Sequence, residues 1–143
     1  MRKDRRGNSM TFWAVYIGFV LIPALTLAVE LGRYFYAIAE VAKAADAAAV
    51  AAAAEINQGT FQESGALVAT DKTWANAQSY VVQNTASLAA KGVYAYVTGI
   101  QVSGTDNTVR VEVSANLSIL FPSIVPDITV TRRGVAKVRA LTR

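Results

Sequence analysis

The chain begins with an apolar stretch that is long enough to cross a membrane. Residues 7–29 contain no Asp, Glu, Lys or Arg, and residues 10–29 are mostly apolar. A helix rises about 1.5 Å per residue, so residues 10–29 match the roughly 30 Å hydrocarbon core of a bilayer. The pattern predicts a transmembrane helix over this segment.

Pro23 lies inside the predicted transmembrane helix. Because proline lacks an N–H and its ring clashes with the preceding turn, we expect a kink or a locally unwound turn, and Gly18 adds flexibility. Two interpretations are open. Either neighbouring helices satisfy the freed carbonyl and the proline is simply tolerated, or the helix changes shape when it leaves the bilayer. The sequence alone favours the first.

An alanine-rich block follows, with twelve alanines in the eighteen positions 37–54. Since alanine is the best helix former, we expect one helix to continue to about residue 57, where Asn, Gln and Gly end it. Small side chains let helices approach closely. Ala44, Ala48 and Ala52 share one face, and we expect them to pack against other helices.

Beyond residue 59 the periodicity indicates a small domain of mixed structure. A second helix is expected from Asp71 to Lys91, capped by Thr70 and ended by Gly92. The chain then alternates between apolar and polar residues, as half-buried antiparallel strands do. Strands are expected over residues 94–102, about 109–116 and 128 to about 141, with a turn at 103–107 between the first two.

The predicted fold class is therefore α+β. A long N-terminal membrane-spanning helix continues into a small globular domain with one helix and an antiparallel sheet of three to four strands. The expected division is a basic cytoplasmic leader (1–7), the long helix (8–58, with the span at 10–29 and the alanine-rich extension at 30–57) and an extracytoplasmic α+β domain (59–143).

The charge distribution predicts the orientation of the span. The first six residues carry four basic side chains and one acidic one, whereas the charges beyond the span are mixed in sign. By the positive-inside rule the N-terminus lies in the cytoplasm and the rest of the chain outside. A cleavable signal peptide is the alternative, but its apolar core is only about 7 to 15 residues long. A retained anchor fits better.

Composition removes several kinds of chemistry. The chain has no cysteine and no histidine, so disulfides, thiol nucleophiles, imidazole bases and Cys/His zinc sites are excluded. Its acidic residues are scattered one at a time, and no glycine-rich phosphate loop is present. We expect no enzyme, no cofactor and no metal site.

Basic residues near the C-terminus do not indicate a nucleic-acid partner. Beyond the leader, ten basic residues face nine acidic ones, so this part of the chain is close to neutral. Charges on a strand face or edge keep it hydrated and prevent unwanted pairing. The pI of about 9.6 comes mostly from the leader.

Three sequence elements in fixed order resemble the N-terminal region of TadE/TadG-like proteins, the pilin-like and pseudopilin components of the tight-adherence (Flp) pilus machinery. They flank or follow the proline-containing span, and the resemblance covers residues 5 to 55. The elements are Arg5-Arg6-Gly7, Glu30-Leu31-Gly32-Arg33 and the alanine-rich Ala44-Ala45-Asp46-Ala47-Ala48-Ala49.

The resemblance implies a prepilin-like protein whose short basic leader is cut after a glycine, here between Gly7 and Asn8. Such prepilins carry a glutamate at the fifth mature position, where it can pair with the new amino terminus of a neighbouring subunit. In this chain that position is Phe12. The departure bears directly on processing and on assembly of the usual pilin type.

The leading hypothesis is a structural subunit, a pilin or minor pilin that assembles through its N-terminal helix. Phe12, Pro23, Glu30, Arg33, Ala44, Ala48 and Ala52 are the expected helix-assembly residues. The implied partners are further copies in a homo-oligomer or filament, the bacterial inner membrane and the pilus assembly machinery. The protein would pass from the membrane to the cell surface or an extracellular filament.

Two alternatives stay open. One is a non-polymerising, membrane-anchored accessory or binding subunit of a cell-surface complex, which the absence of an acid at position 12 favours. The other is a soluble secreted domain released by signal cleavage, which the length of the apolar run disfavours.

Overall fold

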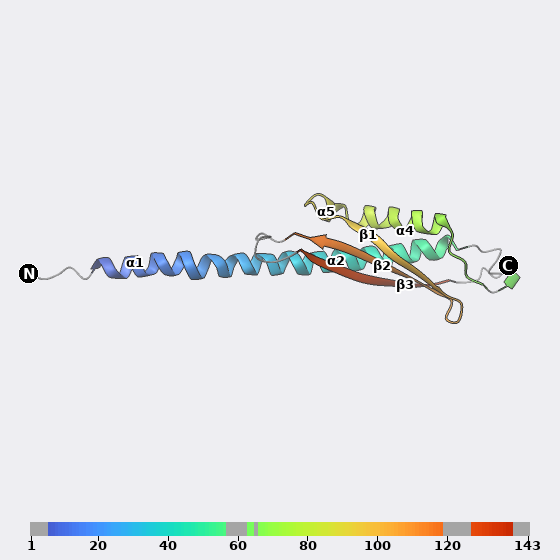
Figure 1. Ribbon diagram of the computed structural model, residues 1–143, viewed down its shortest axis with the longest axis horizontal. Coiled ribbons are helices and arrows are strands. Elements are labelled where there is room, and N and C mark those ends of the chain that lie inside the picture. Colours follow the sequence, from blue (N-terminus) through green and yellow to red (C-terminus); the bar gives the residue numbers. More distant parts are fainter. Residues whose placement is uncertain (1–5, 57–62, 65, 119–126, 139–143) are drawn as a thin grey trace, which may run out of the picture. The chain divides into compact units, whose positions relative to one another are not determined.

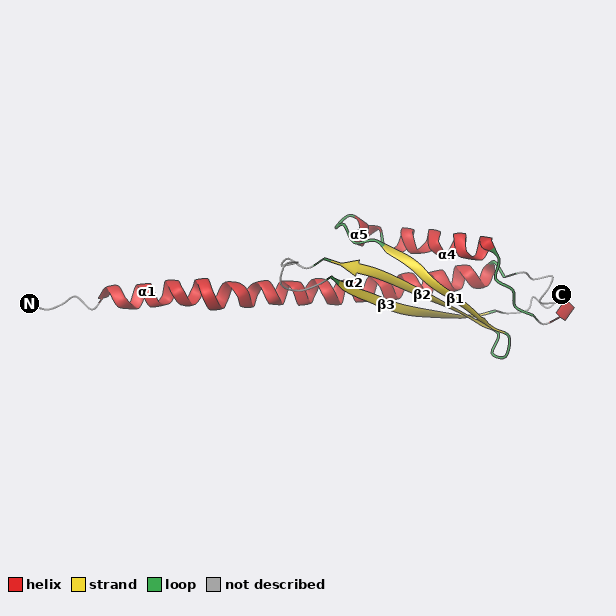
Figure 2. Ribbon diagram, viewed as in Figure 1, coloured by secondary structure: helices red, strands yellow, loops and turns green. Residues whose placement is uncertain are grey.

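The computed structural model describes residues 6–56, 63–64, 66–118 and 127–138 (Figure 1). The chain divides into two compact units, Met1–Phe35 and Tyr36–Arg143. The first unit is helical. The second combines helices with an antiparallel sheet, so the α+β fold class is confirmed (Figure 2).

The N-terminal helical segment contains one irregular turn. Helix α1 covers Arg6–Tyr16, a π-helical turn η1 covers Ile17–Leu21, and α2 covers Ile22–Ala54. In η1 the N–H of Ile22 donates to the carbonyl of Ile17, five residues earlier. Pro23 follows directly, and the ring of a proline clashes with the carbonyl four residues before it. The wider π turn accommodates that ring, so the helix continues instead of unwinding.

The second predicted helix is divided in two. Helix α4 covers Asp71–Asn84 and the short α5 covers Ala86–Ala89. Thr70 and Thr73 form a capping box at the start, as the expected cap implies. Between the helices, the buried hydroxyl and the N–H of Thr85 both donate to the carbonyl of Val81, at 2.8 and 2.9 Å. The N–H bond is the ordinary helical one, and an added hydroxyl bond to the same carbonyl often bends a helix. The Thr85 backbone leaves helical geometry here, with φ −109° and ψ 17°. Gly92 ends the segment with a φ of +76°.

Three antiparallel strands form one sheet in the order β1-β2-β3, which confirms the predicted antiparallel sheet. Strand β1 covers Ala95–Ser103, β2 covers Thr108–Leu117 and β3 covers Ile128–Lys137. The expected extension of the last strand to residue 141 lies outside the described residues. A β-bulge interrupts the β1–β2 register between Val97 and Gly99.

The core of the second unit lies between one sheet face and two helices. Figure 1 shows α4 and the C-terminal half of α2 along this face. Alternate residues of β2 are fully buried, namely Val109, Val111 and Val113. They meet small helix residues from the alanine-rich block and from α4, including Ala77.

The closest packing joins β3 to α2. A Cβ added to Gly134 would lie 2.0 Å from the carbonyl oxygen of Ala45 and 2.7 Å from the amide nitrogen of Asp46. Strand and helix backbones are therefore in direct contact. This contact requires glycine on the strand and small residues on the helix, which gives the alanine-rich block a role inside the chain.

The boundary between the two compact units falls after Phe35, inside the long helix, and the expected domain division after residue 58 stays a prediction. The reason is that α2 is continuous in sequence but changes its environment. Ala37 is the first of its residues to be buried, and nine residues from there to Ala53 join the core of the second unit.

A candidate anchoring and assembly surface

The helical segment that opens the chain is apolar and exposed on all sides. Every residue from Ser9 to Leu25 is exposed, and both Met10 and Phe19 leave 81% of their surface uncovered. One helical stretch, Ser9–Ala54, is long and apolar enough to cross a membrane, with a mean hydropathy of 2.2 in its best window. None of that window is buried. A helix that is apolar all round is stable only in lipid or among other helices.

Aromatic side chains stand at both ends of the apolar stretch, and the sequence reasoning above did not use them. At one end Trp13 contacts Phe12 and Tyr16 edge to face, with centroid distances of 6.3 and 5.8 Å. At the other end Tyr34 and Phe35 lie 5.9 Å apart. Trp and Tyr are enriched at membrane–water interfaces, and the 21 helical steps from Trp13 to Tyr34 cover about 30 Å. This spacing matches one bilayer core.

Glu30 and Arg33 form an ion pair one helical turn apart. The Arg33 Nη1 lies 2.9 Å from the Glu30 Oε1, and the Glu30 side chain is the better covered of the two, at 18% against 42% exposure. The pairing partly neutralises two charges that stand next to an apolar segment. Their expected role in assembly stays a prediction.

The expected cleavage bond and the fifth mature position lie in α1. Gly7 and Asn8 belong to the first turn of that helix, while residues 1–5 lie outside the described residues. Phe12 exposes 65% of its surface and contacts Trp13. Cleavage between Gly7 and Asn8 stays a prediction.

The three alanines expected to contact other subunits are covered by this chain itself. Ala44, Ala48 and Ala52 each have 0% exposure inside the second unit. In the folded chain they offer no surface to a neighbouring helix, because they lie on the side of α2 that faces the sheet. Sequence periodicity alone does not distinguish a helix face that meets its own sheet from one that meets another subunit.

The opposite side of α2 is open. Five exposed residues, which we call the uncovered stripe, follow each other at spacings of three and four along this helix: Ala39, Lys43, Asp46, Val50 and Ala54. Val50 leaves 64% of its surface uncovered. Residues at these spacings share one helix face. The stripe combines small or apolar side chains with one charge of each sign.

Lys43 is held by Glu40 across one turn, with its Nζ 2.7 Å from the Glu40 Oε1. The hydrogen bond to Glu40 and the negative charge of Glu40 raise the pKa of Lys43 above its usual value. The lysine is therefore charged at physiological pH. A raised lysine pKa favours the folded state below pH 10.5, and the effect disappears as the pH rises through the raised pKa.

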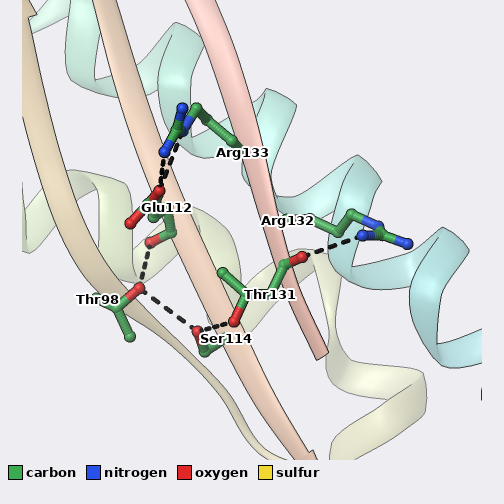
Figure 3. A network of polar contacts seen from close by, with 6 residues as sticks. All are labelled: Thr98, Glu112, Ser114, Thr131, Arg132 and Arg133. Atoms are coloured by element: carbon green, nitrogen blue, oxygen red, sulfur yellow. Dashed lines mark hydrogen bonds and ion pairs between the residues drawn. The ribbon is translucent and has the colours of Figure 1, made fainter. Parts of the chain in front are cut away.

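The sheet face turned away from the helices is polar and internally bonded (Figure 3). The Ser114 hydroxyl lies 2.8 Å from that of Thr131 and 3.5 Å from that of Thr98, so the row crosses all three strands. The guanidinium of Arg133 donates twice to the Glu112 Oε1, once from Nε at 3.1 Å. These polar groups form hydrogen bonds with one another, so this face is suited to contact with water.

Within the described ranges the structure holds no group of three or more His, Cys, Asp or Glu that could bind a metal ion. The charged side chains there occur as the pairs Glu30–Arg33, Glu40–Lys43, Asp106–Arg110 and Glu112–Arg133, or singly. The geometry indicates contact surfaces, with the apolar helix as the most pronounced one.

Comparison with protein families gives one match, and it falls on this helical segment. Residues 7–55, about a third of the chain, match the family model Tad, described as Flp pilus-assembly TadE/G-like. The search of curated proteins found no match, and neither did the search of solved structures. The resemblance to TadE/TadG-like proteins is thereby confirmed over residues 7–55, which contain the Glu-Leu-Gly-Arg and alanine-rich elements, and the N-terminal third of this chain is similar to the Tad family, Flp pilus-assembly TadE/G-like.

Proposed function

We propose that the protein is a structural subunit, a pilin or minor pilin, of a Tad-type pilus or pilus-like filament. It is anchored in the bacterial inner membrane by a single span with its N-terminus in the cytoplasm, and it later enters a filament on the cell surface. The second unit is the part displayed. The observation that carries the proposal is the helix that is apolar and exposed on every side, within a segment that matches the Tad family.

We expect this segment to contact lipid first and the helices of other subunits later. In the membrane, the exposed apolar residues from Met10 to Val29 are covered by lipid. In a filament, the same residues of several subunits cover one another. Removing the apolar segment from water stabilises both states, at about 25 cal/mol per Å² of apolar surface.

The uncovered stripe extends the helix contact beyond the apolar segment. The sheet closes one side of α2, so the side with Ala39, Asp46 and Val50 is the one left for another subunit. Asp46 is exposed there and forms none of the ion pairs among the described residues. A basic residue of a neighbouring subunit would form an ion pair with the Asp46 carboxylate.

Single-cysteine crosslinking tests this arrangement directly, because the natural chain has no cysteine. We expect Ala39→Cys and Val50→Cys to give crosslinked oligomers when the protein is assembled and monomers in dilute detergent. Ser79→Cys, on the exposed side of α4, is the matched control and should stay monomeric in both. Equal crosslinking at all three positions would contradict a defined helix contact.

Electron microscopy of negatively stained protein tests polymerisation itself. Filaments or regular higher assemblies are expected on removal of detergent. Single particles under every condition would instead support the second candidate, a membrane-anchored accessory subunit of a cell-surface complex. The observation that favours this candidate is Phe12, which supplies no acid for pairing with a neighbour's amino terminus.

N-terminal sequencing of the native protein separates the possible forms. A chain that begins at Met1 is a retained anchor, one that begins at Asn8 has been processed like a prepilin, and one that begins near the end of the apolar run has lost a signal peptide.

A further inference from the structure

The second unit has a distinct end at which the chain enters it. Tyr36 is its first residue. The Lys91 Nζ lies 4.3 Å from the centroid of the Tyr36 ring, and the Ser87 hydroxyl lies 3.4 Å from the Glu40 Oε2. These contacts bring α5 and the turn after it against the first turns of α2 in this unit. We call Tyr36, Glu40, Ser87, Lys91 and Tyr94 the entry end.

The entry end carries an available positive charge. Among the described residues, Lys91 is exposed and belongs to none of the four ion pairs. Its contact with the Tyr36 ring orients the ammonium group but leaves its charge in place. Glu40, the acid of this end, is already bound by Lys43 and Ser87. A negatively charged group of another molecule would therefore bind Lys91 without displacing an acidic side chain of this chain.

Exposed tyrosines accompany the charge. Tyr36 leaves 39% of its surface uncovered, and Tyr94, three residues after Lys91, leaves 70% uncovered. A tyrosine presents an apolar ring and a polar hydroxyl, and it is favoured where hydrocarbon gives way to water. Lysine and tyrosine are both side chains that a membrane surface accepts.

Chain length places the entry end within reach of a bilayer surface. Tyr36 follows the last residue of the apolar run, Val29, by seven positions, or about 10 Å of helix. The headgroup layer adds about 5 to 7 Å beyond each side of the hydrocarbon core. A moderate tilt, typical of membrane helices, together with the long side chain of Lys91, closes the remaining distance.

We propose that the entry end binds the phosphate of phospholipid headgroups on the membrane surface where the helix emerges, with Lys91 contacting the phosphate and Tyr36 and Tyr94 lying in the interface. The inference rests on the proposed membrane anchor. It assigns a second lipid contact to the globular unit, separate from the apolar helix, and it leaves the polar sheet face free.

Spin labels on the full chain test the proposal. Ala90→Cys places a label beside Lys91, and Thr105→Cys places one in the turn at the other end of β1, about 30 Å along that nine-residue strand. The protein is inserted into vesicles that contain nickel-chelating lipid headgroups. We expect strong relaxation enhancement at position 90 and little at position 105. Equal, weak enhancement at both positions would overturn the proposal.

Charge changes test the role of Lys91. A lysine near an anionic membrane surface contributes about 1 kcal/mol, so Lys91→Gln should lower the ratio of docked to undocked protein about fivefold in vesicles of phosphatidylcholine and phosphatidylglycerol at three to one. Lys91→Glu should lower it further. Lys72→Glu, at the far end of α4, should change nothing. The same docking ratio in all three variants would overturn the phosphate contact.

A parallel measurement separates failure of this proposal from failure of the anchor. In a Trp74→Phe background, Trp13 is the single tryptophan, and brominated lipids quench it if the helix spans the bilayer. If Trp13 is quenched while the label at position 90 stays remote, the headgroup contact alone is wrong. If Trp13 is not quenched, the membrane anchor is wrong and the contact is wrong with it.

Discussion

At the scale of single residues, the contact between Gly134 and Ala45 leaves no room for a side chain. The two backbones touch where a strand crosses the helix, so neither a side chain on the strand nor a larger one on the helix fits there. Nothing in the alternating pattern of β3 marks this position, because glycine in a strand has several possible meanings. The sequence therefore predicts strand β3 but not its backbone contact with α2.

Gly134→Ala is expected to destabilise the second unit by about 3 kcal/mol or more, at or beyond the upper end of ordinary overpacking. The added methyl group would lie 2.0 Å from a carbonyl oxygen that belongs to backbone and cannot rotate away. Urea unfolding followed by circular dichroism measures the change. Gly99→Ala is the matched control, since its Cβ would meet Glu112 at an ordinary 3.6 Å. Equal stability of the two variants would contradict the backbone contact.

Thr85→Val is expected to cost about 1 kcal/mol. Valine keeps the shape of the buried side chain but loses its hydrogen bond to the Val81 carbonyl. The same unfolding measurement detects it. Thr105→Val, in the exposed β1–β2 turn, should stay within about 0.5 kcal/mol of the natural chain.

At the scale of elements, α2 shows what periodicity can and cannot establish. Composition correctly predicts a helix through the alanine-rich block, and the four-residue spacing correctly groups Ala44, Ala48 and Ala52 on one buried face. The partner of that face is a matter of tertiary structure, and it is the chain's own sheet. Likewise, Thr70 and Gly92 mark both ends of the second helical region, while the break lies at Thr85, whose backbone leaves helical geometry although its N–H keeps the helical bond to Val81.

Two glutamate substitutions should separate folding from assembly. Ala48→Glu puts an unpaired carboxylate into a fully buried site. It should lower the free energy of unfolding by about 3 kcal/mol and unfold the second unit. Val50→Glu, two residues later on the uncovered stripe, should leave the melting temperature within a few degrees of the natural value and still prevent filament formation. Thermal melting and negative-stain microscopy of both variants give the comparison. Filaments of normal appearance from Val50→Glu would exclude the stripe as a contact.

At the scale of the whole molecule, the two units differ in whether their apolar side chains are exposed or buried. The first unit, Met1–Phe35, exposes apolar surface throughout its described residues, whereas the second, Tyr36–Arg143, buries its own apolar side chains between sheet and helices. Hydropathy along the chain predicts the first unit almost completely. The limits of the second unit do not follow from hydropathy, because residues 37–54 continue the same helix with a largely apolar composition but belong to a globular core.

Removal of residues 1–35 should therefore yield a soluble, folded monomer. Its core, which includes Ala37, Val41 and the alternating valines of β2, lies entirely within the retained part. Circular dichroism should show mixed helix and strand with cooperative melting, and size-exclusion chromatography should show one monomeric species. A matched protein that lacks residues 1–56 loses the helix side of the core and should not fold. Aggregation of the first fragment would contradict the independence of the second unit.

The π turn before Pro23 has a consequence for the directions in which side chains point. A turn closed over five residues instead of four takes up one extra residue, and one residue corresponds to about 100° of rotation around a helix. Within the first unit, side chains before Ile17 are therefore turned by about this angle from where an unbroken α-helix would put them relative to those after Leu21. This offset means that Phe12 and Trp13 lie on a different side of the helix, relative to the residues after Leu21, from the one that an unbroken helical wheel would indicate.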